Sequence, residues 1–293
     1  MKGANYGIDA PLVVRRFVVV GVVALALAMV LRSVPRLAAP EFVRWALVAA
    51  GWPLACALIM LLGSKVGKLR LRDALLSRLP WRGNERVLDV GCGRGLLLVG
   101  AAKRLSSGTV IGVDLWRSVD QADNRPEATL ENARIEGVAS RVEVRDGDAR
   151  KLPFEDGAFD VVESSLALHN IEGDQDRAGA VREVIRVVRS GGHIGIIDVW
   201  RISQYRHLLR DAGMENVRLS WPSFWFVAPS FILTASKPAE GARGKMRVTS
   251  AIAQLRTTDL AGSVRFYTTP VRGDRVPARA DTGRYPWTRS TFS

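Results

Sequence analysis

Residues 84–105 read NERVLDVGCGRGLLLVGAAKRL, and this stretch decides the fold. The apolar run at 86–90 predicts a buried β-strand, and the run at 96–105 predicts a helix. Gly91, Gly93 and Gly95 lie in the turn between them. Glycines permit a tight turn and let a ligand approach the backbone without a Cβ in the way. Because the next helix begins with unpaired N–H groups, the unit is suited to a small molecule with an anion or a carboxylate.

Strand and helix signals alternate from residue 84 to residue 237. Strands are predicted at 86–90, 109–114, 141–148, 159–165, 193–200, 216–221 and 231–237, and helices at 96–105, 117–136, 177–188 and 203–213. Strands separated by helices predict a mostly parallel sheet with helices on both faces. In such a sheet the ligand lies beyond the carboxyl ends of the strands. We therefore expect Gly91, Asp114, Asp148 and Glu163 to lie near one another.

Three acids at the ends of the first three strands narrow the choice of ligand. Asp89, just before the glycine turn, would repel a pyrophosphate and attract a cationic amine. The third glycine also comes one residue earlier than in the G-x-G-x-x-G pattern of dinucleotide sites. Asp114 can accept both hydroxyls of a ribose. Asp148 can accept the exocyclic amine of adenine, and the N–H of Ala149 can donate to a ring nitrogen. The set predicts an adenosine with a cationic amino-acid end.

These motifs also carry a family resemblance. The segments are VLDVGCGRG (87–95), VIGVDLW (110–116), VRDGDARKLPFEDGAFDVVESSLALHNI (144–171) and REVIRVVRSGGHIGIIDV (182–199). They resemble the class I S-adenosylmethionine-dependent methyltransferases, closest to the small-molecule branch that includes the ubiquinone/menaquinone-biosynthesis type. The resemblance covers residues 80–237 and implies a seven-stranded Rossmann-like sheet whose last strand is antiparallel. It departs from the family at Ser190, where proline is usual, and this changes only the stiffness of a loop.

The resemblance further implies S-adenosyl-L-methionine as the cofactor and a role for each matching position. The implied cofactor-binding residues are Asp89, Gly91, Cys92, Gly93, Gly95, Asp114, Leu115, Asp148, Ala149 and Glu163. Asp89 and the glycine turn would face the methionine part. Asp114 would hold the ribose, with Leu115 against the adenine, whose edge would meet Asp148 and Ala149. The strand end at 163–166 would border the methyl group and the substrate.

Methyl transfer from a sulfonium is an in-line displacement with an activated leaving group, so positioning does most of the work. A base is needed only if the acceptor must lose a proton from O–H, N–H or an acidic C–H. His169 follows the predicted strand at 159–165 and is the candidate catalytic base. The alternative is a loop residue that shapes the pocket.

Other features have ordinary explanations. Cys92 is interpreted as a small turn residue and not as a nucleophile, since no base lies near it in the sequence. Cys92 and Cys56 are too few for a disulfide framework, and neither belongs to a metal-ligand cluster. For the aromatic cluster at 221–226, packing in the core and at the sheet edge is favoured over lining of a substrate pocket.

Two apolar segments precede this domain. Residues 17–31 and 45–63 carry no charged side chain, and a bilayer core needs about 20 apolar residues. Neither segment has a polar face, which favours a two-helix transmembrane hairpin over two buried helices of a soluble domain. A cleaved signal peptide is the other alternative, and the second apolar segment argues against it. Lys and Arg outside the segments favour a cell-membrane protein whose catalytic domain is cytoplasmic.

The net charge of +13 belongs to the flanks of the chain. Residues 1–82 carry +9, residues 83–236 carry −3 and residues 237–293 carry +7. A catalytic groove for nucleic acid would need basic residues in the middle, so we expect no nucleic-acid partner. Basic flanks beside apolar segments suit anionic lipid headgroups. The expected partners are a membrane and a small-molecule or lipid-like substrate.

The chain therefore divides into four predicted parts. They are a transmembrane hairpin (1–63), a basic amphipathic linker (64–83), the methyltransferase domain (84–237) and a basic, largely disordered tail (238–293). The linker helix could lie on the membrane surface or pack on the domain. Residues 251–269 resemble the opening strand and helix of the glyoxalase/vicinal-oxygen-chelate fold, as a fragment without activity of its own. A chance match is the alternative for that segment.

Together these observations predict an α/β protein with a Rossmann-like, seven-stranded, mostly parallel sheet, preceded by a two-helix transmembrane hairpin. The expected function is a membrane-anchored methyltransferase that acts on a small, apolar or lipid-like acceptor. One alternative is a non-catalytic regulatory protein that binds the adenosyl cofactor. Another is an NAD-dependent oxidoreductase, which the glycine spacing and the Asp148–Ala149 pair disfavour.

Overall fold

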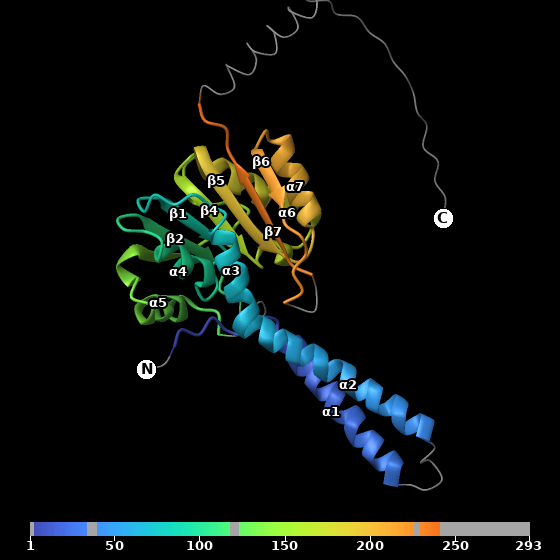
Figure 1. Ribbon diagram of the computed structural model, residues 1–293. Helices are drawn as coiled ribbons and strands as arrows, with labels where there is room; N and C mark the ends of the chain where they lie inside the picture. Colours follow the sequence, from blue (N-terminus) through green and yellow to red (C-terminus); the bar gives the residue numbers. More distant parts are fainter. Residues whose placement is uncertain (1–2, 34–39, 118–122, 226–228, 241–293) are drawn as a thin grey trace, which may run out of the picture. The chain divides into compact units, whose positions relative to one another are not determined.

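The computed structural model describes residues 3–33, 40–117, 123–225 and 229–240 (Figure 1). The chain separates into two compact units, Met1–Arg243 and Gly244–Ser293, and the second lies outside the described residues. The glyoxalase-like resemblance at 251–269 and most of the predicted tail lie there too.

Seven strands among the described residues form one sheet in the order β3-β2-β1-β4-β5-β7-β6. They are β1 (Arg86–Val90), β2 (Thr109–Asp114), β3 (Val142–Asp146), β4 (Phe159–Ser165), β5 (Val188–Asp198), β6 (Glu215–Leu219) and β7 (Phe231–Ser236). Strands β1 to β5 pair in parallel, and β7 pairs antiparallel with β5 and β6. The predicted Rossmann-like sheet with an antiparallel last strand is confirmed.

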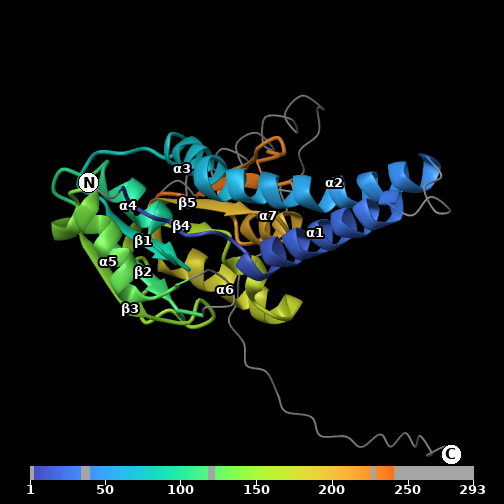
Figure 2. The ribbon, with the colours of Figure 1, turned by 90° about the horizontal axis from the view of Figure 1, so that it is seen from below.

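Helices cover both faces of this sheet (Figures 1 and 2). They are α3 (Lys68–Leu76), α4 (Leu96–Ala102), α5 (Pro126–Ile135), α6 (Asp174–Val187) and α7 (Ile202–Asp211). Val87 of β1 and Val161 of β4 pack with the apolar residues of α3 and α4, whereas Leu88 and Val162 pack with those of α6 and α7. Since successive strand side chains point to opposite faces, odd-numbered residues of β1 and β4 face α3 and α4.

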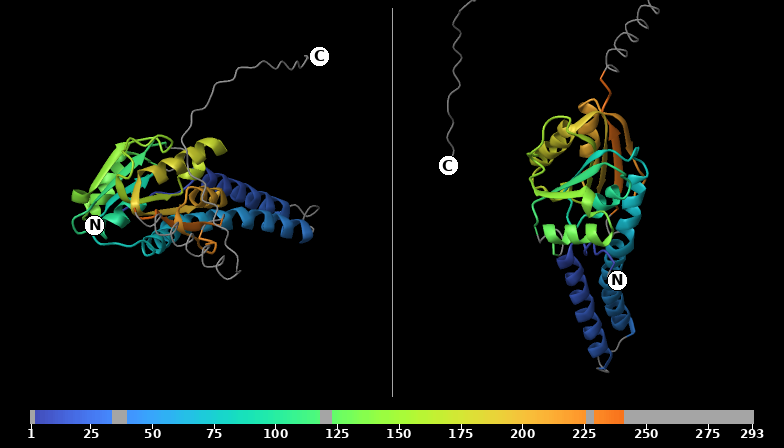
Figure 3. Two further views of the ribbon diagram at one scale, coloured as in Figure 1. Left: turned by 90° about the horizontal axis from the view of Figure 1, so that it is seen from above. Right: turned by 90° about the vertical axis from the view of Figure 1, so that its left-hand side faces the viewer.

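Two long apolar helices, α1 (Pro11–Ser33) and α2 (Pro40–Leu62), run side by side ahead of the domain (Figures 1 and 3). Helix α2 continues through a π-helical turn, Gly63–Gly67, into α3. By length and composition, Pro11–Ser33 and the continuous stretch Pro40–Leu76 could each cross a bilayer. Only 17% and 28% of their most apolar windows are buried, so most of this apolar surface faces outward.

The predicted linker is a helix that packs on the domain. Its helical part ends at Leu76, and Leu71, Leu75 and Leu76 are buried in the core between α4 and the sheet. Of the two alternatives for the linker helix, packing on the domain therefore describes this segment. The apolar stripe that suggested contact with a membrane surface packs against the sheet instead.

The loop between β6 and β7 corrects the interpretation of the aromatic cluster. Trp221 is 91% exposed and Phe224 is 71% exposed, so packing in the core is wrong for both. Trp225 does pack: its side chain closes on Gly67, and the Arg70 guanidinium lies 4.5 Å from its ring centroid. The loop therefore contacts the junction between α2 and α3 through one aromatic ring and presents two others to the outside.

Candidate functional site

The glycine turn has the left-handed backbone conformation that its three glycines permit. Gly91, Gly93 and Gly95 have φ values of +72°, +49° and +81°, which residues with a Cβ rarely adopt. A Cβ on Gly91 would lie 2.2 Å from the Cβ of Ala167, so the loop after β4 passes directly against the turn. The Gly91 N–H donates to the Val113 carbonyl at 2.8 Å. The turn thus lies between the ends of β2 and β4, where the strand order reverses and ligands bind in such sheets.

A cavity of about 910 Å³ lies at these strand ends. That volume falls within the range of small-molecule sites. The predicted residues that line it are Asp89, Gly91, Cys92, Gly93, Asp114, Leu115, Asp148, Ala149 and His169. Gly95 and Glu163 are not among the lining residues. Gly95 is the N-cap residue of helix α4. Alternation with Val161, which packs with α3 and α4, places Glu163 on that side of the sheet, and its predicted place beside the cofactor stays a prediction.

Asp114, at the end of β2, fastens the glycine turn to the second strand. Its Oδ2 accepts a hydrogen bond from the Gly93 N–H at 2.8 Å. Its Oδ1 accepts from the Trp116 N–H at 2.7 Å and from Asn124 Nδ2 at 3.1 Å. Three donors therefore fix this carboxylate at the cavity wall, where it can accept the hydroxyls of a ribose.

Asp148, after β3, is held by a neighbouring arginine. Its carboxylate accepts from Arg150 Nη2 at 2.7 Å and from the Arg150 N–H at 2.9 Å. Arg150 also donates to Asp176 of α6 at 2.9 Å. The hydrogen bonds from Arg150 hold the pKa of Asp148 below its usual value. Asp148 thus stays ionised at neutral pH, as an acceptor for an exocyclic amine should.

Asp89 is the buried acid of the cavity, with an exposure of 1%. Its Oδ2 accepts from the Leu98 N–H of α4 at 2.9 Å, and its Oδ1 has no hydrogen-bond partner among the described residues. Burial raises the pKa of Asp89 to about 7, against the effect of the Leu98 N–H. An unpaired carboxylate oxygen of this kind fits a cationic group placed in the cavity.

Cys92 lines the same cavity and is buried. Burial is the main cause that raises the pKa of its thiol well above the usual value, and the charges of Asp89 and Asp114 act in the same direction. A thiol in such surroundings stays protonated, and a protonated thiol is a poor nucleophile. The geometry supports its interpretation as a small turn residue.

His169 belongs to a hydrogen-bonded cluster that the sequence did not reveal. Its Nδ1 lies 2.5 Å from Oδ1 of Asp198, the last residue of β5. The buried Asp198 also accepts from the His169 N–H at 3.2 Å and from the Tyr205 hydroxyl of α7 at 3.2 Å. Since a carboxylate only accepts, the Nδ1 proton belongs on this hydrogen bond and Nε2 keeps its lone pair. A histidine held in this way can take a proton from a bound acceptor.

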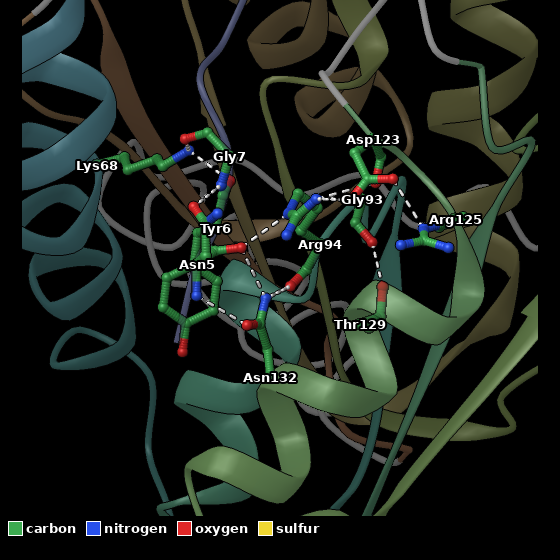
Figure 4. A network of polar contacts seen from close by, with 10 residues as sticks. All are labelled: Asn5, Tyr6, Gly7, Lys68, Gly93, Arg94, Asp123, Arg125, Thr129 and Asn132. Carbon is green, nitrogen blue, oxygen red and sulfur yellow. Dashed lines mark hydrogen bonds and ion pairs between the residues drawn. The ribbon is translucent and has the colours of Figure 1, made fainter. Parts of the chain in front are cut away.

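The N-terminal segment 3–9 is tied to the glycine turn (Figure 4). The carbonyl of Asn5 accepts from Arg94 Nε at 2.7 Å and from Asn132 Nδ2 at 3.0 Å. Arg94 lies inside the turn itself. The buried Lys68 donates to the carbonyls of residues 6 and 7 at 2.7 and 2.8 Å. Arg94 and Asn132 were missed because the sequence offered only backbone roles for this turn.

The apolar helices also reach the cavity. Val13 and Phe17 of α1 and Met60 of α2 line it, together with Lys68 of α3. Two kinds of surface therefore meet in one space. Acids and glycines from the strand ends form one part, and apolar side chains from the helical hairpin form another.

Comparison with known proteins finds similarity to methyltransferases. Residues 88–196 match the model of a methyltransferase domain. The chain is 28% identical over 162 residues to the demethylmenaquinone methyltransferase of Lactobacillus johnsonii, covering 55% of this chain and 58% of that protein. It is 28% identical over 172 residues to the 27-O-demethylrifamycin SV methyltransferase of Amycolatopsis mediterranei, covering 50% of this chain and 60% of that protein. It is 33% identical over 130 residues to the methyltransferase GfsG of Streptomyces halstedii, covering 44% and 43%.

Among solved structures, a putative methyltransferase from Bacillus halodurans aligns with a TM-score of 0.45 at 22% identity, covering 57% of this chain and 99% of that chain. The chain spans between about two fifths and three fifths of the length of the three curated relatives named above. The matched region lies inside the domain at 84–237 and outside the glyoxalase-like segment at 251–269, which gains no support.

Residues 88–196 therefore have the sequence pattern of a methyltransferase domain, and these similarities imply S-adenosyl-L-methionine as the cofactor. The residues present fit that cofactor. Oδ1 of Asp89 lacks a partner where a cationic amine would be placed. The glycine turn keeps side chains away from the same part of the cavity.

Proposed function

We propose that this protein is a membrane-anchored methyltransferase that transfers a methyl group to a small, apolar or lipid-like acceptor by in-line displacement. The observation that carries the proposal is the cavity itself. It joins the acids that suit an adenosyl cofactor to the His169–Asp198 pair and to an apolar wall from α1 and α2. The proposal places the catalytic domain on the cytoplasmic side of the cell membrane.

In this proposal the residues of the cavity bind and orient. S-adenosyl-L-methionine supplies an activated methyl group on a sulfonium. Asp89 accepts hydrogen bonds from the cationic amine, and Asp114 accepts them from the ribose hydroxyls. Asp148 accepts a hydrogen bond from the exocyclic amine of the adenine. Leu115 and Ala149, which line the cavity beside these acids, complete the adenosine site. Holding two reactants in line supplies most of the rate enhancement.

His169 is proposed as the catalytic base. Asp198 fixes the imidazole through Nδ1, so Nε2 can accept the proton that an O–H, N–H or acidic C–H acceptor loses. The carboxylate also stabilises the imidazolium that forms. Apolar side chains from the hairpin exclude water beside the reacting atoms, which strengthens these electrostatic interactions.

The two apolar helices support the membrane anchor. Large apolar side chains face outward along both of them, among them Val20, Val23, Leu27, Trp45 and Trp52. A soluble hairpin would hide such a surface in its own core, because large apolar patches mark contact sites. Since Val13, Phe17 and Met60 line the cavity from the same helices, an apolar acceptor could remain near the membrane while it reacts.

We predict that the full-length protein stays in the membrane fraction after washing with alkaline carbonate. The matched control is the double variant Val20→Arg, Val23→Arg, which places two charges in α1 at a cost of about 2.5–3.5 kcal/mol each in a bilayer. That variant should be released or fail to insert. Release of the wild-type protein by the same wash would remove the membrane anchor from the proposal.

Calorimetry and methyl transfer test the function itself. We expect S-adenosylmethionine and S-adenosylhomocysteine to bind the purified protein and NAD not to bind. Transfer of a labelled methyl group is then measured in parallel into a lipid extract and into an extract of polar metabolites. Label in the lipid extract is the expected result, and label only in the polar extract would contradict a lipid-like acceptor. Binding without transfer into either extract would favour the non-catalytic regulatory protein.

A further inference from the structure

Glu163 is a buried acid that the proposed chemistry does not use. It lies in β4 directly opposite Asp89 of β1 in the parallel register. Both side chains are 1% exposed. Neither carboxyl oxygen of Glu163 has a hydrogen-bond partner among the described residues, and the same is true of Oδ1 of Asp89. Three orphaned acidic oxygens therefore occur on two neighbouring residues.

The two carboxyl groups share one side of the sheet. Val87 and Val161 lie two residues before them and pack against α3 and α4, so alternation places Asp89 and Glu163 on that side as well. Paired strands are about 4.8 Å apart, which brings neighbouring side chains within reach of each other. Two carboxylates at this separation, away from water, do not both ionise. One proton between them would satisfy two of the three orphaned oxygens.

We infer that Glu163 is a positioning residue that keeps its proton at neutral pH and donates it in a hydrogen bond to Oδ1 of Asp89. Asp89 is then held at both oxygens, by the Leu98 N–H on Oδ2 and by the Glu163 hydroxyl on Oδ1, and each oxygen keeps a second lone pair that can accept from the cationic end of the cofactor. Its charge is fixed at the part of the cavity where the cationic end of the cofactor is expected. This inference rests on the proposed function, because it assigns that end to Asp89.

The charges around the pair agree with this assignment. Burial raises the pKa of Glu163 well above its usual value, the Asp89 charge raises it further, and the Arg104 charge lowers it. Asp114 at the end of β2 raises the pKa of Asp89. Cys92 carries no charge at neutral pH, as its raised pKa indicates. From α3, Arg72 and Asp73 act on Arg104.

A proton should therefore leave the site when the cofactor binds near neutral pH. Below about pH 7 most Asp89 is protonated and cannot attract a cation, whereas above it the carboxylate is ionised. Binding thus selects the ionised form, so affinity rises as the pH rises through 7. The dissociation constant of S-adenosylhomocysteine should therefore fall as the pH rises from 6 to 7.5.

The experiment is calorimetry of S-adenosylhomocysteine binding to the full-length protein in detergent. Measurement in two buffers of different ionisation enthalpy gives the number of protons released. We expect a net release of protons at pH 6.5 that becomes smaller as the pH rises to 8. The release should persist in His169→Ala and vanish in Asp89→Asn. If it vanishes in His169→Ala instead, the proton comes from the histidine and the inference is overturned.

Two substitutions at Glu163 distinguish its role as a hydrogen-bond donor to Asp89 from a role in filling space in the core. Glu163→Gln keeps a hydrogen-bond donor, so affinity and the midpoint of the pH dependence should match the wild type. Glu163→Met fills similar space without a donor, so the midpoint should shift upward by about one unit. Affinity at pH 7.5 would then drop by about threefold and recover at higher pH. Glu143→Gln on β3, an exposed acid paired with Arg145, is the matched control and should change nothing.

Two outcomes overturn the inference: binding with no proton release, or the same pH midpoint for the Gln and Met variants. Both can occur while the cofactor binds tightly, so they leave the proposed function intact. Failure of S-adenosylhomocysteine to bind the wild-type protein at any pH between 6 and 8 is a different result. It would remove the proposed function together with this inference.

Discussion

Replacing His169 with alanine is expected to lower kcat for methyl transfer by about 10²- to 10⁴-fold, the usual contribution of a positioned base. The dissociation constant of S-adenosylhomocysteine should stay within about twofold, because the acids proposed to bind the cofactor lie on other strand ends. The measurement is single-turnover transfer of labelled methyl into the lipid extract, with cofactor binding followed separately. Added imidazole should restore part of the lost rate in the variant.

Variants of the supporting residues test the same assignment. Asp198→Asn keeps the shape but can present an N–H to Nδ1, which favours the tautomer that lacks a lone pair at Nε2. We expect a drop in kcat that approaches the effect of His169→Ala. Tyr205→Phe removes one of several hydrogen bonds to Asp198 and should cost about 0.5–1.5 kcal/mol of stability with little effect on rate.

A His169→Ala protein with unchanged kcat would show that the acceptor needs no base. His169 would then be a pocket residue, the alternative that the sequence left open. Loss of cofactor binding in the same variant would point to a general disturbance of the loop after β4. That loop packs against Gly91, so the two readouts must be measured together.

The sheet and most of the site could be predicted because both follow from local signals. The glycine turn fixes the order strand, turn, helix, and parallel strands bring their carboxyl ends to one edge. Asp89, Asp114 and Asp148 therefore had to meet once their strands were assigned. All three do line one cavity.

The partners of His169 could not be predicted without the fold, whereas the side of the sheet on which Glu163 lies could. Asp198 is 29 residues from His169, and no local pattern joins the end of β5 to the loop after β4. The strand predicted over 159–165 has the same bounds as β4, and Glu163 lies two residues before its end. The alternation of Val161 and Glu163 carried the correct direction, since both belong on one face.

The start of helix α5 differs from the prediction. A helix was predicted over 117–136, yet α5 begins at Pro126. Proline suits the first turn of a helix because its missing N–H is not needed there, and this signal was present in the sequence. The linker leucines did not show whether the helix lies on a membrane or packs on the domain, since an apolar stripe fits a bilayer surface and a sheet equally well.

Asp114→Ala is expected to weaken cofactor binding by about 1.5–3 kcal/mol, the contribution of hydrogen bonds to a charged group. This corresponds to a rise of about 10- to 150-fold in the dissociation constant. Part of the effect is indirect, because Asp114 also accepts from the Gly93 N–H and helps to hold the turn. The measurement is calorimetric titration with S-adenosylhomocysteine, alongside thermal unfolding of the unliganded protein.

The matched control for Asp114 is Asp146, its partner in the register of β2 and β3. Asp146→Asn keeps an acceptor for Trp116 Nε1 and should leave cofactor affinity unchanged. Asp114→Asn separates the two roles of the carboxylate, since an amide oxygen can still accept from the turn while the negative charge is lost. If Asp114→Asn binds as tightly as the wild type and Asp114→Ala does not, Asp114 acts by shaping the turn. If both variants bind as tightly as the wild type, the ribose is held elsewhere and the end of β2 lies outside the cofactor site.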